Sequence, residues 1–214
     1  MIKIVNWNIR HGKGLDNIVD IRRIGEKLKS FNADIYTIQE IDRGAERSGY
    51  EDQAEILSEI LGCEFHFTHI SKVPEGTYGL ATFSKLKMAN KDGMILSRNF
   101  ENNSAQLTRF NIRQSMFDVV NLHAPWKNST TYWKNFLGEY NLDECILTGD
   151  FNLSPSSTII KNFRGKYNWK NEQFTTDNGK LIDYTFMPFK ILSQEVHETN
   201  LSDHHILVTT FDLW

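Results

Sequence analysis

Residues 146–155 read ILTGDFNLSP, an apolar run that leads directly into Gly149, Asp150 and Asn152. A short apolar run closed by turn-forming residues predicts a buried β-strand. Residues two apart on an extended chain point to the same side, and a glycine lets the backbone come close to a neighbour. The stretch therefore predicts a strand end at which a carboxylate and an amide face one spot.

Strand-like and helix-like segments alternate along the rest of the chain. Helical spacing of apolar residues covers residues 18–31, 52–61, 130–140 and 156–163. Strands are expected at residues 2–9, 34–40, 63–69, 78–84, 105–112, 116–122, 145–149, 182–187 and 205–211. Several strands follow one another with no helix between them, which favours two mixed, mostly antiparallel sheets packed face to face and flanked by helices. We expect this α/β fold, of the α+β type, to form a single domain over residues 1–214.

Composition limits the class of protein. The chain has 214 residues, of which 40% are hydrophobic, and a formal net charge of −3. That balance lacks the positive excess typical of proteins that bind nucleic acid tightly and without specificity. No apolar run approaches the roughly 20 residues of a membrane span. We expect a cytoplasmic monomer without membrane insertion, in which Cys63 and Cys145 are unpaired.

Other predicted strands also end at polar side chains. Together with Asp150 and Asn152, these strand-end residues are Asn8, Glu40, His123, Asp183, Asp203 and His204. Any one Asp or Asn after a strand is commonly only a turn residue. Carboxylates, amides and imidazoles together are the ligands of a hard divalent cation and the groups that move protons. The set therefore predicts a metal-assisted catalytic site.

Seven motifs occur in the order NWNIRHG, IQEIDRG, YGLATFSK, NLHAPW, LTGDFNLSP, LIDYTF and SDHHILV. In this order they resemble the endonuclease/exonuclease/phosphatase superfamily, which includes DNase I-like nucleases, apurinic endonucleases, sphingomyelinases and inositol polyphosphate phosphatases. The resemblance spans nearly the whole chain. It implies a four-layer, DNase I-like α/β sandwich with a phosphoesterase site at the edge of the two central sheets.

The resemblance also implies a metal site. Glu40 matches the principal ligand, Asn8 matches an asparagine near the metal, and Asp203 would reach the ion directly or through water. The expected cofactor is Mg²⁺, which prefers oxygen ligands and keeps several waters. Mn²⁺ is a possible substitute.

The remaining matched residues are implied in the hydrolysis itself. Asp150 would position or activate the attacking water, and His204 would either accept its proton or hold the phosphate. Asp183 matches the carboxylate that orients His204. Asn152 would donate to a phosphate oxygen, and His123 would neutralise charge on the phosphoryl group. The neighbouring His205 competes for the role of His204, but adjacent residues of an extended strand point to opposite faces, so only one can face the site.

Some positions depart from the family pattern. Arg10 stands where several relatives have an aspartate, and we interpret it as a partner of phosphate or of a neighbouring carboxylate. Arg43 and Arg47 follow Glu40 and either bind substrate phosphates or balance the carboxylates of the site. Leu80 replaces a frequent asparagine, so contacts with the substrate are expected to differ.

Three functions remain open from the sequence. The first is a metal-dependent phosphodiesterase acting by direct attack of water, a nuclease on DNA or RNA. The second is a phosphatase or phosphodiesterase of a small phosphorylated metabolite, lipid headgroup or inositol phosphate. The third is a non-catalytic binding module. A protein that only binds would have no chemical reason to retain the whole set of polar residues. Four aromatic residues near the motifs either stack on bases or fill the core: Trp7, Tyr78, Trp126 and Phe174.

Overall fold

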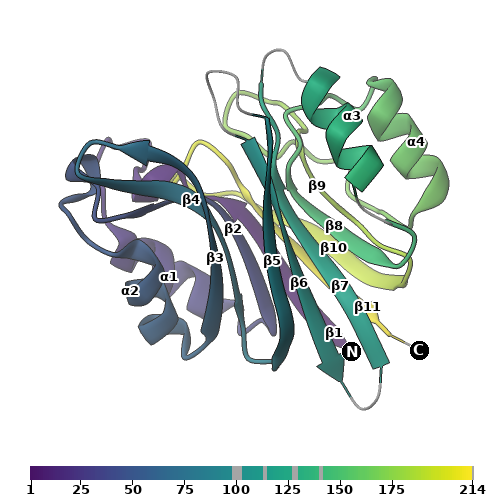
Figure 1. Ribbon diagram of the computed structural model, residues 1–214, viewed down its shortest axis with the longest axis horizontal. Helices are drawn as coiled ribbons and strands as arrows, with labels where there is room; N and C mark the ends of the chain where they lie inside the picture. Colours follow the sequence, from purple (N-terminus) through teal and green to yellow (C-terminus); the bar gives the residue numbers. More distant parts are fainter. Residues whose placement is uncertain (98–102, 113–114, 127–129, 140–141, 214) are drawn as a thin grey trace.

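The computed structural model describes residues 1–97, 103–112, 115–126, 130–139 and 142–213 (Figure 1). In chain order the elements are β1 (Ile2–Asn8), η1 (Arg10–Gly12), α1 (Ile21–Ser30), β2 (Ile35–Arg43), η2 (Glu46–Ser48), α2 (Gln53–Leu61), β3 (Glu64–Val73), β4 (Gly76–Ser84), β5 (Met88–Ser97), β6 (Asn103–Ile112), β7 (Ser115–His123), α3 (Thr130–Glu139), β8 (Cys145–Asp150), α4 (Thr158–Lys166), β9 (Asp183–Phe186), β10 (Lys190–His197) and β11 (Ile206–Asp212).

Two mixed sheets form the centre of the molecule. One has six strands in the order β10-β11-β1-β2-β4-β3, and the other has five in the order β5-β6-β7-β8-β9. Strand β1 is parallel to β2 and β7 is parallel to β8, whereas the other neighbours are antiparallel. Helices α1 and α2 cover the outer face of one sheet, and α3 and α4 cover that of the other. The structure confirms the expected α/β sandwich.

Two of the predicted helices begin at aspartate N-caps. The carboxylate of Asp20 accepts hydrogen bonds from the N–H groups of Arg22 and Arg23, and Asp52 plays the same part for α2. A cap satisfies N–H groups that the first helical turn leaves without a partner. The helix expected over residues 18–31 is therefore shorter, because α1 begins only after Asp20.

The sequence analysis missed strands β5 and β10. Both lie at an edge of their sheet, where a strand bonds to only one neighbour. Strand β5 contains the polar run Asn90–Gly93, and the register of β10 with β11 shifts between Ile191 and Ser193. The other two edge strands, β3 and β9, were expected from their apolar residues, so an edge position permits the loss of the apolar pattern but does not impose it.

Apolar side chains fill both outer layers. Trp7, Ile24 and Leu57 belong to the cluster between α1, α2 and the six-stranded sheet. Trp133 and Phe151 belong to the cluster between α3, α4 and the other sheet. Cys63 and Cys145 are buried in these layers, one in each. Among the described residues, no helix has the length and apolar character needed to cross a membrane.

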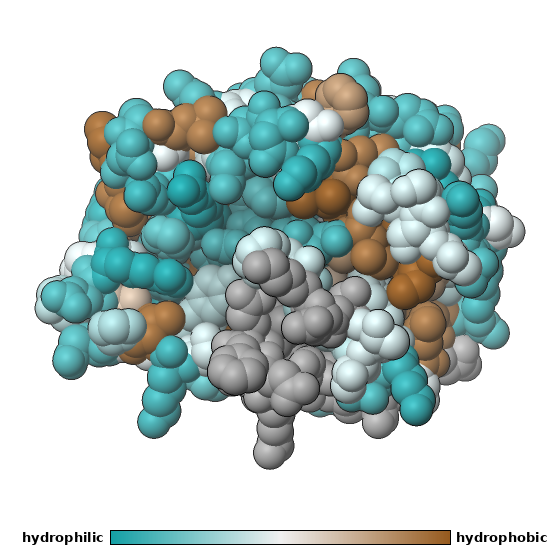
Figure 2. Space-filling view, turned by 90° about the horizontal axis from the view of Figure 1, so that it is seen from above, coloured by the Kyte–Doolittle hydropathy of each residue, from teal (hydrophilic) through white to brown (hydrophobic). Residues whose placement is uncertain are grey.

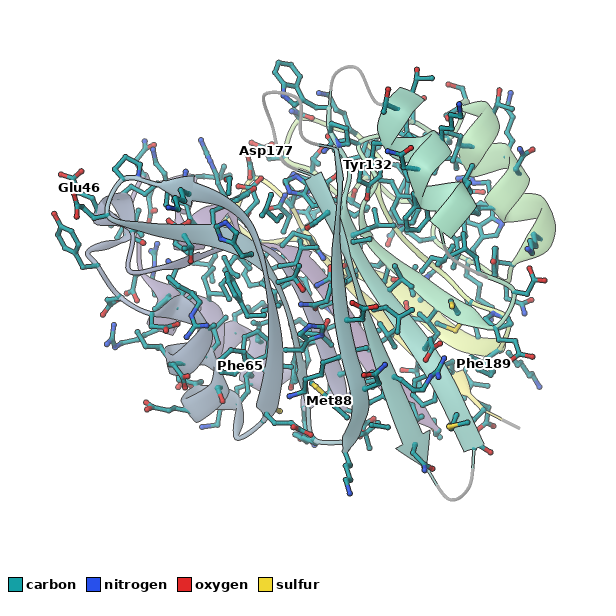
Figure 3. All side chains as sticks on the ribbon, viewed as in Figure 1. Glu46, Phe65, Met88, Tyr132, Asp177 and Phe189 are labelled. Atoms are coloured by element: carbon teal, nitrogen blue, oxygen red, sulfur yellow. The ribbon has the colours of Figure 1, made fainter. Side chains whose placement is uncertain are left out.

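The layer between the sheets changes character along its strands. On β7, Phe117 and Val119 join an apolar cluster at one end of this layer, Asn121 follows in the middle, and His123 ends the strand. Figure 3 labels Met88 and Phe189 at the apolar end and Asp177 at the opposite end. The same order recurs on β8 in Ile146, Thr148 and Asp150.

Buried amides connect the two sheets through the middle of this layer. Gln39 Nε2 donates to Asn6 Oδ1 at 2.8 Å on the neighbouring strand and to Asn121 Oδ1 at 2.7 Å on the opposite sheet. Asn121 Nδ2 donates in turn to the carbonyl of Ala81 at 3.1 Å. Such a network fixes the register of one sheet against the other, because each buried polar group left without a partner is costly.

Candidate active site

The candidate site lies where the polar ends of the inner strands meet. Asn8 is the last residue of β1, His123 of β7 and Asp150 of β8, while Asp183 is the first residue of β9 and Glu40 lies in β2. Figure 2 looks onto this end of the molecule and shows hydrophilic side chains around a hollow. The topology thus brings residues from five strands to one place.

Asn8 joins two of the carboxylates. Its Nδ2 lies 3.1 Å from Glu40 Oε1 and 3.1 Å from Asp150 Oδ2, and donates to both. Two further hydrogen bonds fix Asn8 in place. Its side-chain Oδ1 accepts the backbone N–H of Arg10 at 3.1 Å, and its backbone carbonyl accepts the hydroxyl of Ser202 at 2.8 Å. Asn8 therefore fixes the spacing of Glu40 and Asp150.

His204 forms a pair with Asp183. The ring Nδ1 lies 2.9 Å and 3.1 Å from the two carboxylate oxygens, and Nε2 lies 3.8 Å from Asp150 Oδ2. Burial lowers the pKa of His204, but the carboxylates of Asp183, Asp150 and Asp203 outweigh burial and raise the pKa to about 10. At neutral pH the ring is consequently an imidazolium that donates from both nitrogens.

His123 faces the same carboxylates from the other side. Its Nε2 lies 3.6 Å from Asp150 Oδ2 and 3.8 Å from Glu40 Oε1, and Tyr78 Oη lies 3.3 Å from its Nδ1. Burial, followed by the negative charge of Asp183, raises the pKa of Asp150. Asp150 is thus a buried, unusually basic carboxylate between two imidazoles.

Asn152 adds a further amide at the end of β8. Its backbone N–H donates to Asp150 Oδ1 at 2.9 Å, and its Nδ2 donates to the carbonyl of Ala124 at 2.8 Å. Gly149 permits this geometry, since its φ is 144° and a Cβ there would lie 2.0 Å from the carbonyl oxygen of Leu122. The glycine in ILTGDFNLSP is therefore required by the close approach of β7.

Four residues at or beside the site have a left-handed backbone conformation. Arg10, His11, Glu40 and Asn152 all have positive φ, between 46° and 59°. Residues other than glycine rarely adopt this conformation, and each instance costs on the order of 1 kcal/mol or more. The surrounding fold holds these four residues in strained positions at the candidate site.

Two of the three arginines that the sequence singled out, Arg10 and Arg43, lie in different places. Arg10 Nε lies 3.7 Å from Asp203 Oδ2 at the rim of the site. Arg43 lies outside the cluster, where its guanidinium forms a bidentate pair with Asp52 and stacks over Phe67 at 5.1 Å.

The two neighbouring histidines face different surroundings, as the extended-strand argument predicts. His204 is in the site, whereas His205 Nδ1 accepts the N–H of Thr199 at 3.4 Å. His205 lines a separate cavity of about 580 Å³ together with the exposed Phe174.

The four aromatic residues near the motifs differ in how deeply they are buried. Trp7 is fully buried in the core, where its Nε1 donates to the carbonyl of His204 at 2.9 Å. Tyr78 is partly buried against His123. Trp126 and Phe174 remain 62% and 63% exposed.

Three further groups support the site: Ser202 was not singled out from the sequence, and Trp7 and Tyr78 were expected there only to stack on bases or fill the core. Tyr78 contacts His123, Ser202 bonds to the carbonyl of Asn8, and Trp7 bonds to the carbonyl of His204. Only Ser202 carried a local signal, because it stands directly before Asp203 and His204 in SDHH. The partners of Tyr78 and Trp7 are far away in the chain, so spacing alone gives no sign of them.

The site fits a divalent cation by the chemistry of its donors. Ligand atoms of Asp150, Asp183 and His204 lie within 4.8 Å of one another. Glu40 adds a carboxylate whose side chain is 25% exposed, whereas those of Asp150 and Asp183 are 2% and 1% exposed. Buried carboxylates this close together favour a bound positive charge.

A two-sheet α/β sandwich with carboxylates, imidazoles and amides at one end of its strands defines a phosphoesterase of the DNase I-like class. The sequence matches the model of the endonuclease/exonuclease/phosphatase family over residues 5–204, so the chain belongs to this family. Its members are phosphoester hydrolases and generally use divalent metals. The comparison with curated proteins gave no match.

Solved structures share the fold at low sequence identity. A functionally unknown conserved protein from Enterococcus faecalis has a TM-score of 0.82 at 16% identity, and the match covers 99% of each chain. ANGEL2, a 2′,3′-cyclic phosphatase, has a TM-score of 0.77 at 15% identity, covering 98% of this chain and 95% of its own. A mannosyl-6-phosphatase from Bacteroides thetaiotaomicron has a TM-score of 0.71 at 15% identity, covering all of both chains.

Proposed function

We propose that this protein is a Mg²⁺-dependent phosphodiesterase that cleaves DNA or RNA by direct attack of water, with Mn²⁺ able to replace Mg²⁺. The observation that carries this proposal is the convergence on Asp150 Oδ2. Asn8 Nδ2 lies 3.1 Å from that oxygen, His123 Nε2 lies 3.6 Å and His204 Nε2 lies 3.8 Å from it. One basic carboxylate with donors on three sides suits hydrolysis, in which a proton leaves water while charge builds on phosphate.

Asp150 would orient the attacking water and accept its proton. His204 would donate from Nε2 to a phosphoryl oxygen, because both oxygens of Asp183 engage its Nδ1. His123 would donate to the phosphoryl group from the other side. Asn152 uses one Nδ2 hydrogen for the carbonyl of Ala124, and an amide nitrogen has a second hydrogen to offer a phosphoryl oxygen.

Glu40 is the best candidate to hold the cation, with Asn8 and Asp203 beside it. Its carboxylate and that of Asp203 are 25% and 38% exposed, so an ion that keeps several waters can reach them. Asp183 is instead committed to His204. A bound Mg²⁺ would act as a Lewis acid and stabilise negative charge on the phosphate.

One exposed aromatic side chain supports a nucleic-acid substrate. Trp126, which follows His123 closely in the chain, can stack on a base, and a stacked base contributes roughly 1 to 3 kcal/mol. A pocket of about 320 Å³ lies beside the site and is lined by Glu40 and Asp203 among others. Its small size favours a second candidate function, hydrolysis of a small phosphorylated metabolite. The mannosyl-6-phosphatase on the same fold is a protein of that second kind.

Hydrolysis of bis(p-nitrophenyl) phosphate and p-nitrophenyl phosphate, with Mg²⁺ or Mn²⁺ and with an EDTA control, tests the proposal. We expect turnover of the diester that EDTA abolishes, followed by cleavage of DNA or RNA oligonucleotides. Preference for the monoester would support the metabolite phosphatase instead. Absence of turnover of every ester would contradict both enzymes.

Two neighbouring histidines supply a matched pair of variants. His204→Ala should lower kcat by roughly 10²- to 10³-fold, the range for the loss of one donor to the charge that develops in the transition state. His205→Ala should leave kcat nearly unchanged, because His205 faces the separate cavity. Equal losses in both variants would mean that His204 acts only through the fold of this segment.

A further inference from the structure

A pocket of about 320 Å³ lies beside the candidate site. Glu40 and Asp203 line it, so it opens onto the carboxylates proposed to hold the cation. Arg10, Arg47 and Tyr78 form other parts of its wall, and Tyr78 contacts His123 of the site. The volume is at the small end of the range for ligand pockets. The pocket is therefore continuous with the site and large enough for a chemical group next to the phosphate that is cleaved.

Arg47 is held rigidly in the wall of this pocket. Its Nε and Nη2 lie 2.8 Å and 2.7 Å from the two oxygens of Asp42, which is fully buried. The guanidinium stacks over the ring of Tyr78 at 5.3 Å and is still 41% exposed. Only two of the five N–H donors of Arg47 bond to Asp42. The other three are available to a ligand in a fixed orientation.

Arg10 supplies a second cation on the same pocket. Its φ of 46° is strained, and its Nε lies 3.7 Å from Asp203 Oδ2, a long ion pair that leaves the side chain 35% exposed. The next residue, His11, has a φ of 46° as well, and its buried Nδ1 has no hydrogen-bond partner among the described residues. His11 also lines the pocket.

The charges of the pocket favour an anion. Two guanidinium groups face two carboxylates, Glu40 and Asp203, and these carboxylates would be neutralised by a bound cation. Arginine binds phosphate and carboxylate groups through paired N–H donors. With the cation in place, the pocket carries an excess of positive charge.

From these contacts we infer that the pocket is a second anion subsite, in which Arg47 and Arg10 select phosphoesters that carry another anionic group, such as a terminal phosphate, next to the one that is cleaved. This inference rests on the proposed function and narrows its substrate class. Arg47 is a binding residue for that second group and takes no part in the bond cleavage.

Arg43 provides a matched control for Arg47. Both arginines form a bidentate pair with an aspartate and stack over an aromatic ring, Arg43 with Asp52 and Phe67. Only Arg47 lines the pocket. Arg43→Gln therefore controls for the loss of a paired arginine. The side chain of Asp42 is fully buried whereas that of Asp52 is 34% exposed, so the double variant Asp42→Asn/Arg47→Gln controls for the buried charge.

Hydrolysis of the thymidine dinucleotide TpT and of its 5′- and 3′-phosphorylated forms measures the selection. Wild-type protein should prefer one of the phosphorylated forms by about 10-fold or more in kcat/KM, the range of a charged hydrogen bond. Arg47→Gln should remove this preference through KM with kcat retained, and Arg43→Gln should keep it. Loss of the preference in both variants, or in neither, would overturn the inference.

Binding of thymidine 3′,5′-bisphosphate and thymidine 5′-monophosphate, measured by calorimetry with Ca²⁺, does not depend on turnover. Wild-type protein and Arg43→Gln should bind the bisphosphate more tightly, and Arg47→Gln should bind both alike. Because Arg47→Gln leaves Asp42 buried and unpaired, the double variant Asp42→Asn/Arg47→Gln should be measured beside it. Tighter binding of the bisphosphate without diester turnover would sustain the subsite and contradict the proposed function. Diester turnover with equal binding of both nucleotides in the wild type would support the proposed function and contradict the subsite.

Discussion

The outer layers of this sandwich and the layer between its sheets are built differently. Helices pack on the outer faces mainly through apolar side chains, including Trp7, Leu57 and Trp133. Between the sheets the apolar cluster occupies one end, and buried amides and hydroxyl groups occupy the part toward the site. The comparison suggests a division of labour, in which the outer layers stabilise the fold and the central layer fixes the positions of the reactive groups.

Physical chemistry gives a reason for this division. Apolar packing is strong but tolerant of small displacements, whereas a buried hydrogen bond contributes little net stability and is costly when it is lost. The hydrogen bond between Gln39 and Asn121 joins the two sheets close to the site, because Gln39 precedes Glu40 on β2 and Asn121 lies two residues before His123 on β7. Substitutions in the two regions should therefore separate stability from activity.

The largest effect is expected for Asp150→Asn at the polar end of the central layer. It should reduce kcat by about 10²- to 10⁴-fold, because the neutral amide accepts no proton from water. The free energy of unfolding, measured with EDTA present, should stay the same or rise, since burial and Asp183 both disfavour the charge of Asp150. A large loss of stability would instead assign the carboxylate a structural role.

Leu57→Ala tests the outer layer. Leu57 is fully buried between α2 and the six-stranded sheet, and truncation of such a side chain costs about 2 to 5 kcal/mol in unfolding free energy. Denaturant unfolding should show this loss, while the diester kcat/KM of the folded variant should stay within a factor of about two. A strong fall in kcat/KM would show that the outer layer also positions the site.

Asn121→Ala tests the middle of the central layer. The variant removes an acceptor of Gln39 and leaves the carbonyl of Ala81 without its donor, at a cost of about 1 to 3 kcal/mol. Unlike Leu57→Ala, it should also lower kcat, by roughly 10-fold, because Glu40 and His123 lose a shared support. Equal kcat in Asn121→Ala and wild-type protein would contradict the division of labour.

The inner strands of the fold were predictable because burial imposes a pattern on them. In ILTGDFNLSP the apolar run, the glycine and the i, i+2 pair each have a local cause that the structure shows. Strands β5 and β10 were not predictable, since the polar run Asn90–Gly93 interrupts the pattern of β5 and the register of β10 is irregular, whereas the edge strands β3 and β9 kept a recognisable apolar pattern. Sequence pattern therefore identifies a strand only where both of its faces, or one of them, must be buried.

The candidate site divides along similar lines. Asn8 and Asp150 end the inner strands β1 and β8, and Asp183 begins β9, which pairs with β8, so topology alone brings them together. Arg43 and Arg47 both follow Glu40 closely in the chain, and only the three-dimensional fold shows that Arg43 turns to Asp52 while Arg47 lines the pocket. A contact that depends on which way a loop side chain turns leaves no periodic signal in the sequence.

The smallest expected effect concerns His66, which lies in the central layer with its Nδ1 3.0 Å from Thr108 Oγ1. Burial, followed by the charge of Lys91 and opposed by that of Asp92, lowers the pKa of His66 from 6.5 to about 4. The unfolded chain therefore takes up this proton first, so the contribution is fully present above pH 6.5 and is lost as the pH falls toward 4. With solvent screening, the loss should be about 1 to 2 kcal/mol. Urea unfolding at pH 7 and pH 4.5 should show a smaller acid-induced loss in His66→Gln than in the wild type, and equal losses would mean that the polar layer admits the charge without cost.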